Sequence, residues 1–219
     1  MLEKMKEFFE ARLDGYDEHM LTNIECAKEF YPFTAKQLPM FDNCHILDLG
    51  CGTGLELEEY YLLNPKAKVT GIDLSQKMLD VLKKKFMDKD MTLICDSYFD
   101  VDFGEEVFDS AVSVESLHHF TKEVKLPLYT KLYKSLKNDG YFILTDYFSL
   151  SNEEEKMHQD NLMALKKELG IVDDEFYHYD IPLTIQHEIE VLLEAGFTVE
   201  VLNNWGATYS IKAIKWVRL

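Results

Sequence analysis

Hydrophobic side chains in the first part of the chain recur every three or four residues, which is the spacing of an amphipathic helix. In residues 2–14 they share one helical face, at Met5, Phe8, Phe9 and Leu13. In residues 17–31 the same spacing returns, at Met20, Ile24, Ala27 and Phe30. The pattern therefore predicts two amphipathic helices before the first strand.

After Pro39 the pattern changes to short apolar runs that alternate with helical segments. Such runs are typical of strands that are buried on both faces of a parallel sheet and connected by helices. They predict strands at 45–50, 68–74, 91–97, 108–116 and 141–148. Helices are expected at 54–63, from Ser75 onward, and through Tyr129, Leu132, Tyr133 and Leu136. Asn138-Asp139-Gly140 is expected to turn the chain into the fifth strand.

The last third of the chain predicts an inserted helix and a closing hairpin. A polar helix is expected to begin at Ser151 with a capping box and to lie over the sheet. Another helix follows and ends at Gly196. Residues 197–205 and 209–216 then form two strands, and the short link between them predicts an antiparallel hairpin at the sheet edge. The expected fold class is α/β, with seven strands.

Composition and charge limit the function. The chain has 219 residues, 47% of them hydrophobic, which suits a single domain over 1–219. Lys and Arg number 23 against 40 Asp and Glu, so the formal net charge is −17. An anionic surface repels phosphate backbones, so we expect no nucleic-acid partner. Charged residues interrupt the N-terminal segment, which argues against a signal peptide or a membrane span and for a cytoplasmic protein.

The cysteines do not form a recognisable site. Cys26, Cys44, Cys51 and Cys95 are scattered, without a C-x-x-C pair. This spacing argues against a disulfide framework and against structural zinc. We also find no acidic trio of the catechol-type magnesium site, so we expect no metal.

The sharpest chemical feature is the run Ile46-Leu47-Asp48-Leu49-Gly50-Cys51-Gly52-Thr53-Gly54, where an apolar strand enters three alternating glycines. Ligands of open parallel sheets bind beyond the carboxyl ends of the strands, where such a turn lies. Asp73, 23 residues after Gly50, ends the second strand, where a carboxylate can accept hydrogen bonds from ribose hydroxyls. A dinucleotide fingerprint is incomplete, because Leu55 stands where its third glycine belongs.

Four segments in this order resemble the class I S-adenosylmethionine-dependent methyltransferases of the small bacterial, small-molecule type. They are ILDLGCGTG (46–54), GIDLS (71–75), ICDSYFD (94–100) and LKNDGYFILTD (136–146). The resemblance implies a Rossmann-like three-layer α/β/α sandwich with an antiparallel last strand. It divides the domain into N-terminal lid helices (1–40), a cofactor-binding core (41–148), a helical insertion (149–182), and a C-terminal helix with the hairpin (183–219).

The resemblance also implies S-adenosylmethionine as the cofactor and assigns residues to it. Gly50 and Gly52 would let the loop close on the methionyl part, and Asp48 would anchor that loop or reach the ammonium. Asp73 would hold the ribose, and Asp96 would accept the adenine amine. The full set of expected cofactor-binding residues is Asp48, Gly50, Cys51, Gly52, Asp73, Leu74, Asp96, Ser97, Val114 and Glu115.

The acceptor is expected to approach the segment after the fourth strand. His118 and His119 lie there, and either one could act as a base if the acceptor must lose a proton. The alternative is that a histidine there only closes the helix start or packs in the pocket wall. Expected substrate-pocket residues are Tyr16, Asp146, Tyr147 and His178.

We therefore expect methyl transfer to a small molecule that the sequence does not identify. A nicotinamide-dependent oxidoreductase and a non-catalytic S-adenosylmethionine-binding protein, with 151–170 as its contact surface, are the alternatives. A third is carboxyl transfer onto the cofactor, which needs a cation near the pocket. Arg12 and Arg218 are the arginines available for that purpose.

Overall fold

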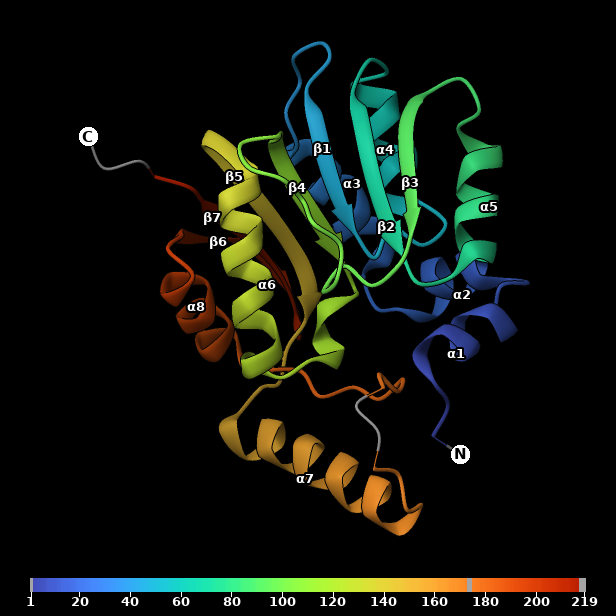
Figure 1. The fold of residues 1–219 in the computed structure, drawn as a ribbon, viewed down its shortest axis with the longest axis vertical. Helices are drawn as coiled ribbons and strands as arrows, with labels where there is room; N and C mark the ends of the chain where they lie inside the picture. The colour runs from blue at the N-terminus through green and yellow to red at the C-terminus, as the bar shows by residue number, and fades with distance from the viewer. Residues whose placement is uncertain (1, 173–174, 217–219) are drawn as a thin grey trace.

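The computed structural model describes residues 2–172 and 175–216, so Arg218 lies outside the described residues. Its centre is one seven-stranded sheet with the strand order β3-β2-β1-β4-β5-β7-β6 (Figure 1). The strands are β1 (His45–Leu49), β2 (Lys68–Asp73), β3 (Asp90–Cys95), β4 (Phe108–Val114), β5 (Leu136–Tyr147), β6 (Thr198–Trp205) and β7 (Thr208–Ile214).

Strand directions confirm the predicted topology. The first five strands pair in parallel, whereas β7 is antiparallel to both β5 and β6. Only Gly206 and Ala207 separate β6 from β7, and Gly206 takes a left-handed φ of 60°, which a tight hairpin turn favours. The strand order reverses beside β1, which places a topological switch point between β1 and β4.

Helices cover both faces of the sheet and give it three layers. The helices α3 (Ala27–Gln37) and α4 (Leu55–Leu63) pack on one face, and α6 (Lys122–Ser135) and α8 (Ile185–Glu194) pack on the other (Figure 1). The helix α5 (Gln76–Lys85) contacts β2 and β3. Neighbouring residues of β1 belong to different cores, because Ile46 packs with α3 and α4 while Leu47 packs with α6.

The N-terminal segment forms three helices where two were predicted. They are α1 (Met5–Ala11), α2 (Tyr16–Asn23) and α3. The predicted helix over 17–31 is interrupted between Asn23 and Ala27, where Ile24 is extended and Cys26 has a left-handed φ of 59° that cannot continue a right-handed helix. The break turns α3 onto the sheet and leaves α1 and α2 at the end toward which the parallel strands point (Figure 1).

The fifth strand begins earlier than predicted. Leu136 already pairs with Phe108, and Asn138-Asp139-Gly140 lies within β5 as an irregularity and not as a turn before it. A Cβ on Gly140 would lie 2.9 Å from the carbonyl oxygen of Lys137. The register shift between Phe108 and Ser110 shows that β5 bulges here without leaving the sheet. The residue types of such a bulge are the same as those of a turn, so the sequence does not distinguish the two.

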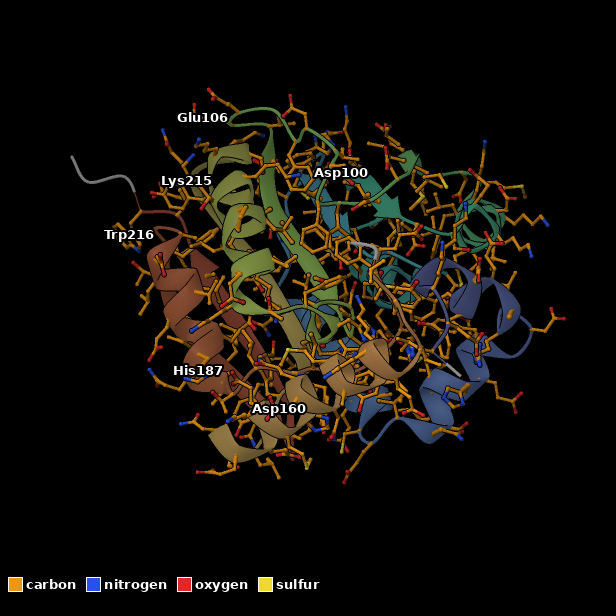
Figure 2. All side chains as sticks on the ribbon, turned by 60° about the horizontal axis from the view of Figure 1, so that its bottom comes forward. Asp100, Glu106, Asp160, His187, Lys215 and Trp216 are labelled. Carbon is orange, nitrogen blue, oxygen red and sulfur yellow. The ribbon has the colours of Figure 1, made fainter. Side chains whose placement is uncertain are left out.

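The predicted polar helix is α7 (Asn152–Glu168), which lies beyond the end of the sheet and not over it as expected (Figure 1). Ser151 caps it, because its Oγ accepts from the Glu154 amide at 3.2 Å. Its one buried residue, Glu155, accepts from the Thr184 amide at 2.6 Å and lies 2.8 Å from the His187 ring of α8. Figure 2 shows His187 on α8 and Asp160 on α7. Among the described helices, none is long and apolar enough to span a bilayer.

Candidate functional site

The turn after β1 is held tightly by its neighbours. Gly50 and Gly52 adopt left-handed φ values of 75° and 45°. The amide nitrogens of Gly50 and Cys51 both donate to the carbonyl oxygen of Ile72, at 2.9 and 3.2 Å. A Cβ on Gly50 would lie 2.2 Å from Ser116 Oγ, so a side chain there would clash. The turn brings bare backbone to the carboxyl end of the sheet, as a ligand cradle requires.

Asp73 at the end of β2 joins this turn to the next helix. Its Oδ2 accepts from the Gly52 amide at 2.9 Å, and its Oδ1 accepts from the Ser75 amide at 2.8 Å. Burial raises the pKa of Asp73, and the two amide donors oppose that shift. Each carboxylate oxygen keeps a second lone pair, so Asp73 can still accept from the hydroxyls of a ribose.

Asp48 and Glu56 lie on either side of the glycine turn, Asp48 in β1 and Glu56 in the first turn of α4. Both are buried, and Asp48 Oδ2 and Glu56 Oε1 have no hydrogen-bond partner. Buried acceptors without partners are costly, so they indicate a missing donor. An ammonium group, such as that of S-adenosylmethionine, would have suitable N–H donors for these carboxylate oxygens.

The segment after β3 contains the expected adenine-binding residues. Asp96 is exposed. It lies next to Asp73, because its amide donates to the Asp73 carbonyl oxygen at 3.1 Å. Ser97 is buried, and its hydroxyl accepts from the Phe99 amide at 3.2 Å. The ammonium of Lys131 donates to three carbonyl oxygens of this loop, at 2.6–2.9 Å. Sequence reasoning missed Lys131, because nothing in its local pattern distinguishes it from a surface lysine.

Glu115, directly after β4, has a conformation that is rare for a non-glycine residue. Its φ is 49°, and its amide donates to the Thr145 carbonyl oxygen at 2.9 Å. Burial and the nearby Asp146 carboxylate raise the pKa of Glu115 to about 8. Its Oε1 has no partner among the described residues. A strained backbone of this kind is typical of functional sites.

A cavity of about 880 Å³ opens beside Glu115. Its wall combines aromatic side chains of the N-terminal helices with polar groups of the sheet end, among them Phe9, Tyr16, Glu115, His118, His119 and Asp180. Glu115 of its wall directly precedes Ser116, whose side chain occupies the space that a Cβ on Gly50 would need. A cavity of this size and mixed lining suits a small molecule.

His118 belongs to a short 3₁₀ turn, Leu117–His119, after β4. Its Nδ1 lies 2.6 Å from Asp146 Oδ1, and Asp146 Oδ2 accepts from the Leu117 amide at 2.8 Å. Its Nε2 lies 3.6 Å from Asp180 Oδ1. Burial alone would lower the pKa of His118, but the Asp146 and Asp180 carboxylates raise it to about 10. At neutral pH His118 is therefore a fixed cation.

His119 has the opposite electrostatic character. Burial and the charge of His118 lower its pKa, so the imidazole is neutral at pH 7. Its Nδ1 lies 3.1 Å from Asp180 Oδ1 and 3.3 Å from the Tyr179 carbonyl oxygen. Both neighbours are acceptors, so the proton is assigned to Nδ1 and the lone pair to Nε2. Thus His118 is an imidazolium cation, and its neighbour His119 is a neutral imidazole.

The expected pocket residues separate into two groups. Tyr16, Tyr147 and His178 line the cavity, and the His178 ring stacks on Phe8 with a centroid distance of 3.4 Å. Asp146 does not line the cavity, because it lies behind His118. Asp180 completes the wall, although it was not among the pocket residues expected from the sequence.

Ligand atoms of His118, His119 and Asp180 lie within 4.8 Å of one another. Such a set has the composition of a metal site. The hydrogen bonds and ion pairs among these groups and Asp146 account for their approach without an ion, so a metal-free site stays our prediction.

Comparisons with known proteins identify a methyltransferase domain in this chain. A family model described as a methyltransferase domain matches residues 46–140. A carboxy-S-adenosyl-L-methionine synthase of Nautilia profundicola is 28% identical over 98% of this chain and 96% of its own length. A malonyl-[acyl-carrier protein] O-methyltransferase of Priestia megaterium is 32% identical, but the match spans 47% of this chain and 36% of that relative.

Solved structures show the same fold. The YcgJ protein of Bacillus subtilis superposes with a TM-score of 0.68 over 86% of this chain and 98% of its own. The identity is 13%, so this likeness concerns the fold alone. The family match covers the glycine turn, Asp73, Asp96 and the His118 turn together. Residues 46–140 thus match a methyltransferase domain, and the comparisons together support a class I S-adenosylmethionine-dependent methyltransferase whose cofactor is S-adenosylmethionine.

Proposed function

We propose that the protein transfers a methyl group to a small molecule that binds in the cavity beside the glycine turn. The observation that carries this proposal is the neutral His119 in the cavity wall, next to the His118 cation that Asp146 holds in place. When bound, S-adenosylmethionine supplies a methyl group on a positively charged sulfur. Gly50, Gly52 and Asp73 would hold the cofactor, and the cavity would hold the acceptor.

In this proposal His119 is the proton acceptor. Its Nδ1 proton is directed at Asp180, so Nε2 can take a proton from a hydroxyl or amine of the acceptor. His118 cannot fill this role at neutral pH, because it already carries two protons. Its charge instead keeps His119 neutral and balances Asp146 and Asp180. Alignment of the acceptor with the methyl group provides the remaining acceleration.

We expect Asp73→Ala to weaken cofactor binding about 10- to 100-fold, because a lost acceptor leaves ribose hydroxyls unpaired at a cost of about 1–3 kcal/mol. Calorimetric titration with S-adenosylhomocysteine measures the change. Asp73→Asn keeps one acceptor oxygen beside the Gly52 amide and should lose less affinity. Equal affinity in Asp73→Ala and the wild type would contradict the ribose assignment.

The turnover rate should depend on pH in a bell shape. The active form has neutral His119, whose pKa is lowered, so activity persists below pH 6.5 and falls only as His119 gains a proton. Activity falls again as His118 loses its proton near pH 10, because its charge then no longer balances Asp146 and Asp180. Asp146→Asn removes the nearest carboxylate and should move the upper limb to lower pH. If the upper limb did not move in this variant, it could not be assigned to the titration of His118.

Activity is tested with purified protein, methyl-labelled S-adenosylmethionine and fractionated metabolite extracts. We expect S-adenosylhomocysteine together with one labelled product. Failure to form S-adenosylhomocysteine with any fraction would contradict methyl transfer and favour a non-catalytic binding protein.

Carboxyl transfer onto the cofactor is the second candidate, because the Nautilia relative matches over nearly its whole length and Arg12 lines the cavity. Arg12 is already paired with Glu3 through two contacts, at 2.9 and 3.1 Å, so its charge is compensated. For this reason we favour methyl transfer. Mass spectrometry of the same reactions separates the two, since carboxyl transfer would enlarge the cofactor and form no S-adenosylhomocysteine.

A further inference from the structure

Acidic side chains are prominent around the cavity beside Glu115. The acidic residues that line it are Asp14, Glu25, Glu115 and Asp180. Asp14 and Glu25 are exposed, so they carry charge where the cavity meets the solvent. The chain as a whole has a formal net charge of −17, so the surrounding field has the same sign. Both properties attract a cation and repel an anion as it approaches.

Arg12 and His118 carry positive charge in the described part of the wall, but both are already compensated. Arg12 contacts Glu3 twice, at 2.9 and 3.1 Å. His118 lies between Asp146 and Asp180, at 2.6 and 3.6 Å. An anionic ligand would therefore have to displace a carboxylate to pair with either cation.

Glu115 lacks such compensation. One of its carboxylate oxygens lies within 4.8 Å of ligand atoms of His118 and Asp146, so three carboxyl groups, with that of Asp180, share one imidazolium. Its Oε1 has no hydrogen-bond partner among the described residues, which indicates a donor that a ligand supplies. Burial and Asp146 raise the pKa of Glu115 to about 8, and a cation beside it would restore the ionised form.

This cavity lies apart from most residues that are expected to hold the cofactor. Of that set, Glu115 is the member that lines it. Gly50 and Gly52 of the glycine turn and the carboxyl of Asp73 are not part of its wall. The unpartnered oxygen of Glu115 is therefore assigned to the acceptor.

Aromatic rings complete the wall of the cavity. Phe9, Tyr16, Tyr147 and Trp205 line it, and each is half-buried, so part of each side chain is free to contact a ligand. The face of an aromatic ring attracts a cation, and the same ring packs well against hydrocarbon. Acidic groups together with aromatic rings are typical of sites that bind organic ammonium ions.

We propose that the acceptor is a small organic amine, bound as an ammonium ion whose N–H groups donate to Glu115 and whose apolar part packs on the aromatic wall. This inference rests on the proposed function, because it names the class of acceptor. The ammonium is the group that the cavity recognises, and His119 remains the proton acceptor for the atom that is methylated.

Calorimetric titration of the full chain, saturated with S-adenosylhomocysteine at pH 7, tests the proposal with three probes of similar shape. Phenethylamine carries an ammonium, 2-phenylethanol a neutral hydroxyl and phenylacetate a carboxylate. We expect phenethylamine to bind roughly tenfold more tightly than 2-phenylethanol, and phenylacetate to bind most weakly. Binding of the alcohol or the acid as tight as that of the amine, or absence of amine binding, would overturn the proposal.

Glu115→Gln removes the carboxylate and keeps the shape and backbone of the residue. We expect this variant to bind phenethylamine roughly tenfold more weakly, and to bind 2-phenylethanol and S-adenosylhomocysteine within about twofold of the wild type. Glu194→Gln, at the exposed end of α8, is the matched control and should bind all three as the wild type does. Equal affinity for phenethylamine in the wild type and Glu115→Gln would exclude Glu115 as the ammonium contact. Thermal unfolding verifies that each variant is folded.

The natural acceptor provides a second test. In reactions with methyl-labelled S-adenosylmethionine, the labelled product should arise from the metabolite fraction that a cation exchanger retains at pH 7. Product that arises only from anionic or uncharged fractions would overturn the amine and leave methyl transfer standing. Binding of phenethylamine without labelled product from any fraction would overturn methyl transfer and leave the ammonium site standing.

Discussion

His119→Ala is expected to lower kcat by about 10²- to 10⁴-fold, which is the usual contribution of a positioned general base. The variant loses the neutral imidazole that lines the acceptor cavity, while the glycine turn and Asp73 stay intact. The dissociation constant of S-adenosylhomocysteine should therefore stay within about twofold of the wild type. Single-turnover kinetics with an identified acceptor measures the rate, and calorimetry measures the binding.

Two comparisons make this prediction specific. His158→Ala removes a histidine of α7 whose ion-pair partner is Glu154 at 3.9 Å, and it should leave kcat unchanged. His118→Ala removes the cation and should raise the pKa of His119, so its lower pH limb should move upward. Equal rates in the wild type and His119→Ala would exclude His119 as the base. The acceptor would then react without losing a proton in the rate-limiting step.

Much of the fold was predictable because the main signals are local. Short apolar runs identify buried strands wherever both faces of a sheet are covered, and Ser151 and Thr184 cap helices with their own side chains. The break at Cys26 and the early start of β5 were not predictable. In both places the backbone follows its tertiary neighbours, and the residue types there do not specify the conformation.

The position of the expected cofactor-binding residues in the fold was predictable for a similar reason, while their roles stay predictions. Gly50 and Asp96 follow parallel strands and Asp73 ends one, and carboxyl ends of adjacent parallel strands meet at one edge. Asp180 and Glu56 have no such marker. Asp180 reaches the histidines from a segment more than sixty positions away, and Glu56 is buried whereas Glu58 and Glu59 of the same helix are not. Charge, burial and long-range proximity are properties of the fold, which spacing alone does not reveal.

The role of Asp146 shows the same limit. Its place at the end of β5 predicted a pocket residue, because side chains there point toward bound ligands in many sheets. The structure instead directs both of its oxygens to the His118 turn, at 2.6 and 2.8 Å. Asp146 thus acts on the cavity through His118. The charge of Asp146 therefore matters for the proposed function although its side chain does not line the cavity.

Lys125→Met is expected to destabilise the protein by about 3–5 kcal/mol, because it leaves a buried carboxylate without its cation. Lys125 of α6 and Glu188 of α8 are 1% and 0% exposed, and their charged atoms lie 2.5 Å apart. Glu188 also accepts from the Tyr129 hydroxyl, which cannot neutralise its charge. Urea unfolding followed by circular dichroism measures the loss, and the melting temperature should fall by about 10 °C.

The double variant Lys125→Met/Glu188→Met distinguishes an uncompensated charge from lost packing. Both side chains are then apolar, so most of the lost stability should return, since a well-packed apolar pair often matches a buried ion pair. Lys122→Met, at the exposed start of the same helix, should change stability by less than about 0.5 kcal/mol. If the double variant were as unstable as Lys125→Met, the contact between α6 and α8 would depend on packing of the aliphatic part of the lysine side chain. The ion pair would then only offset the cost of burying its two charges.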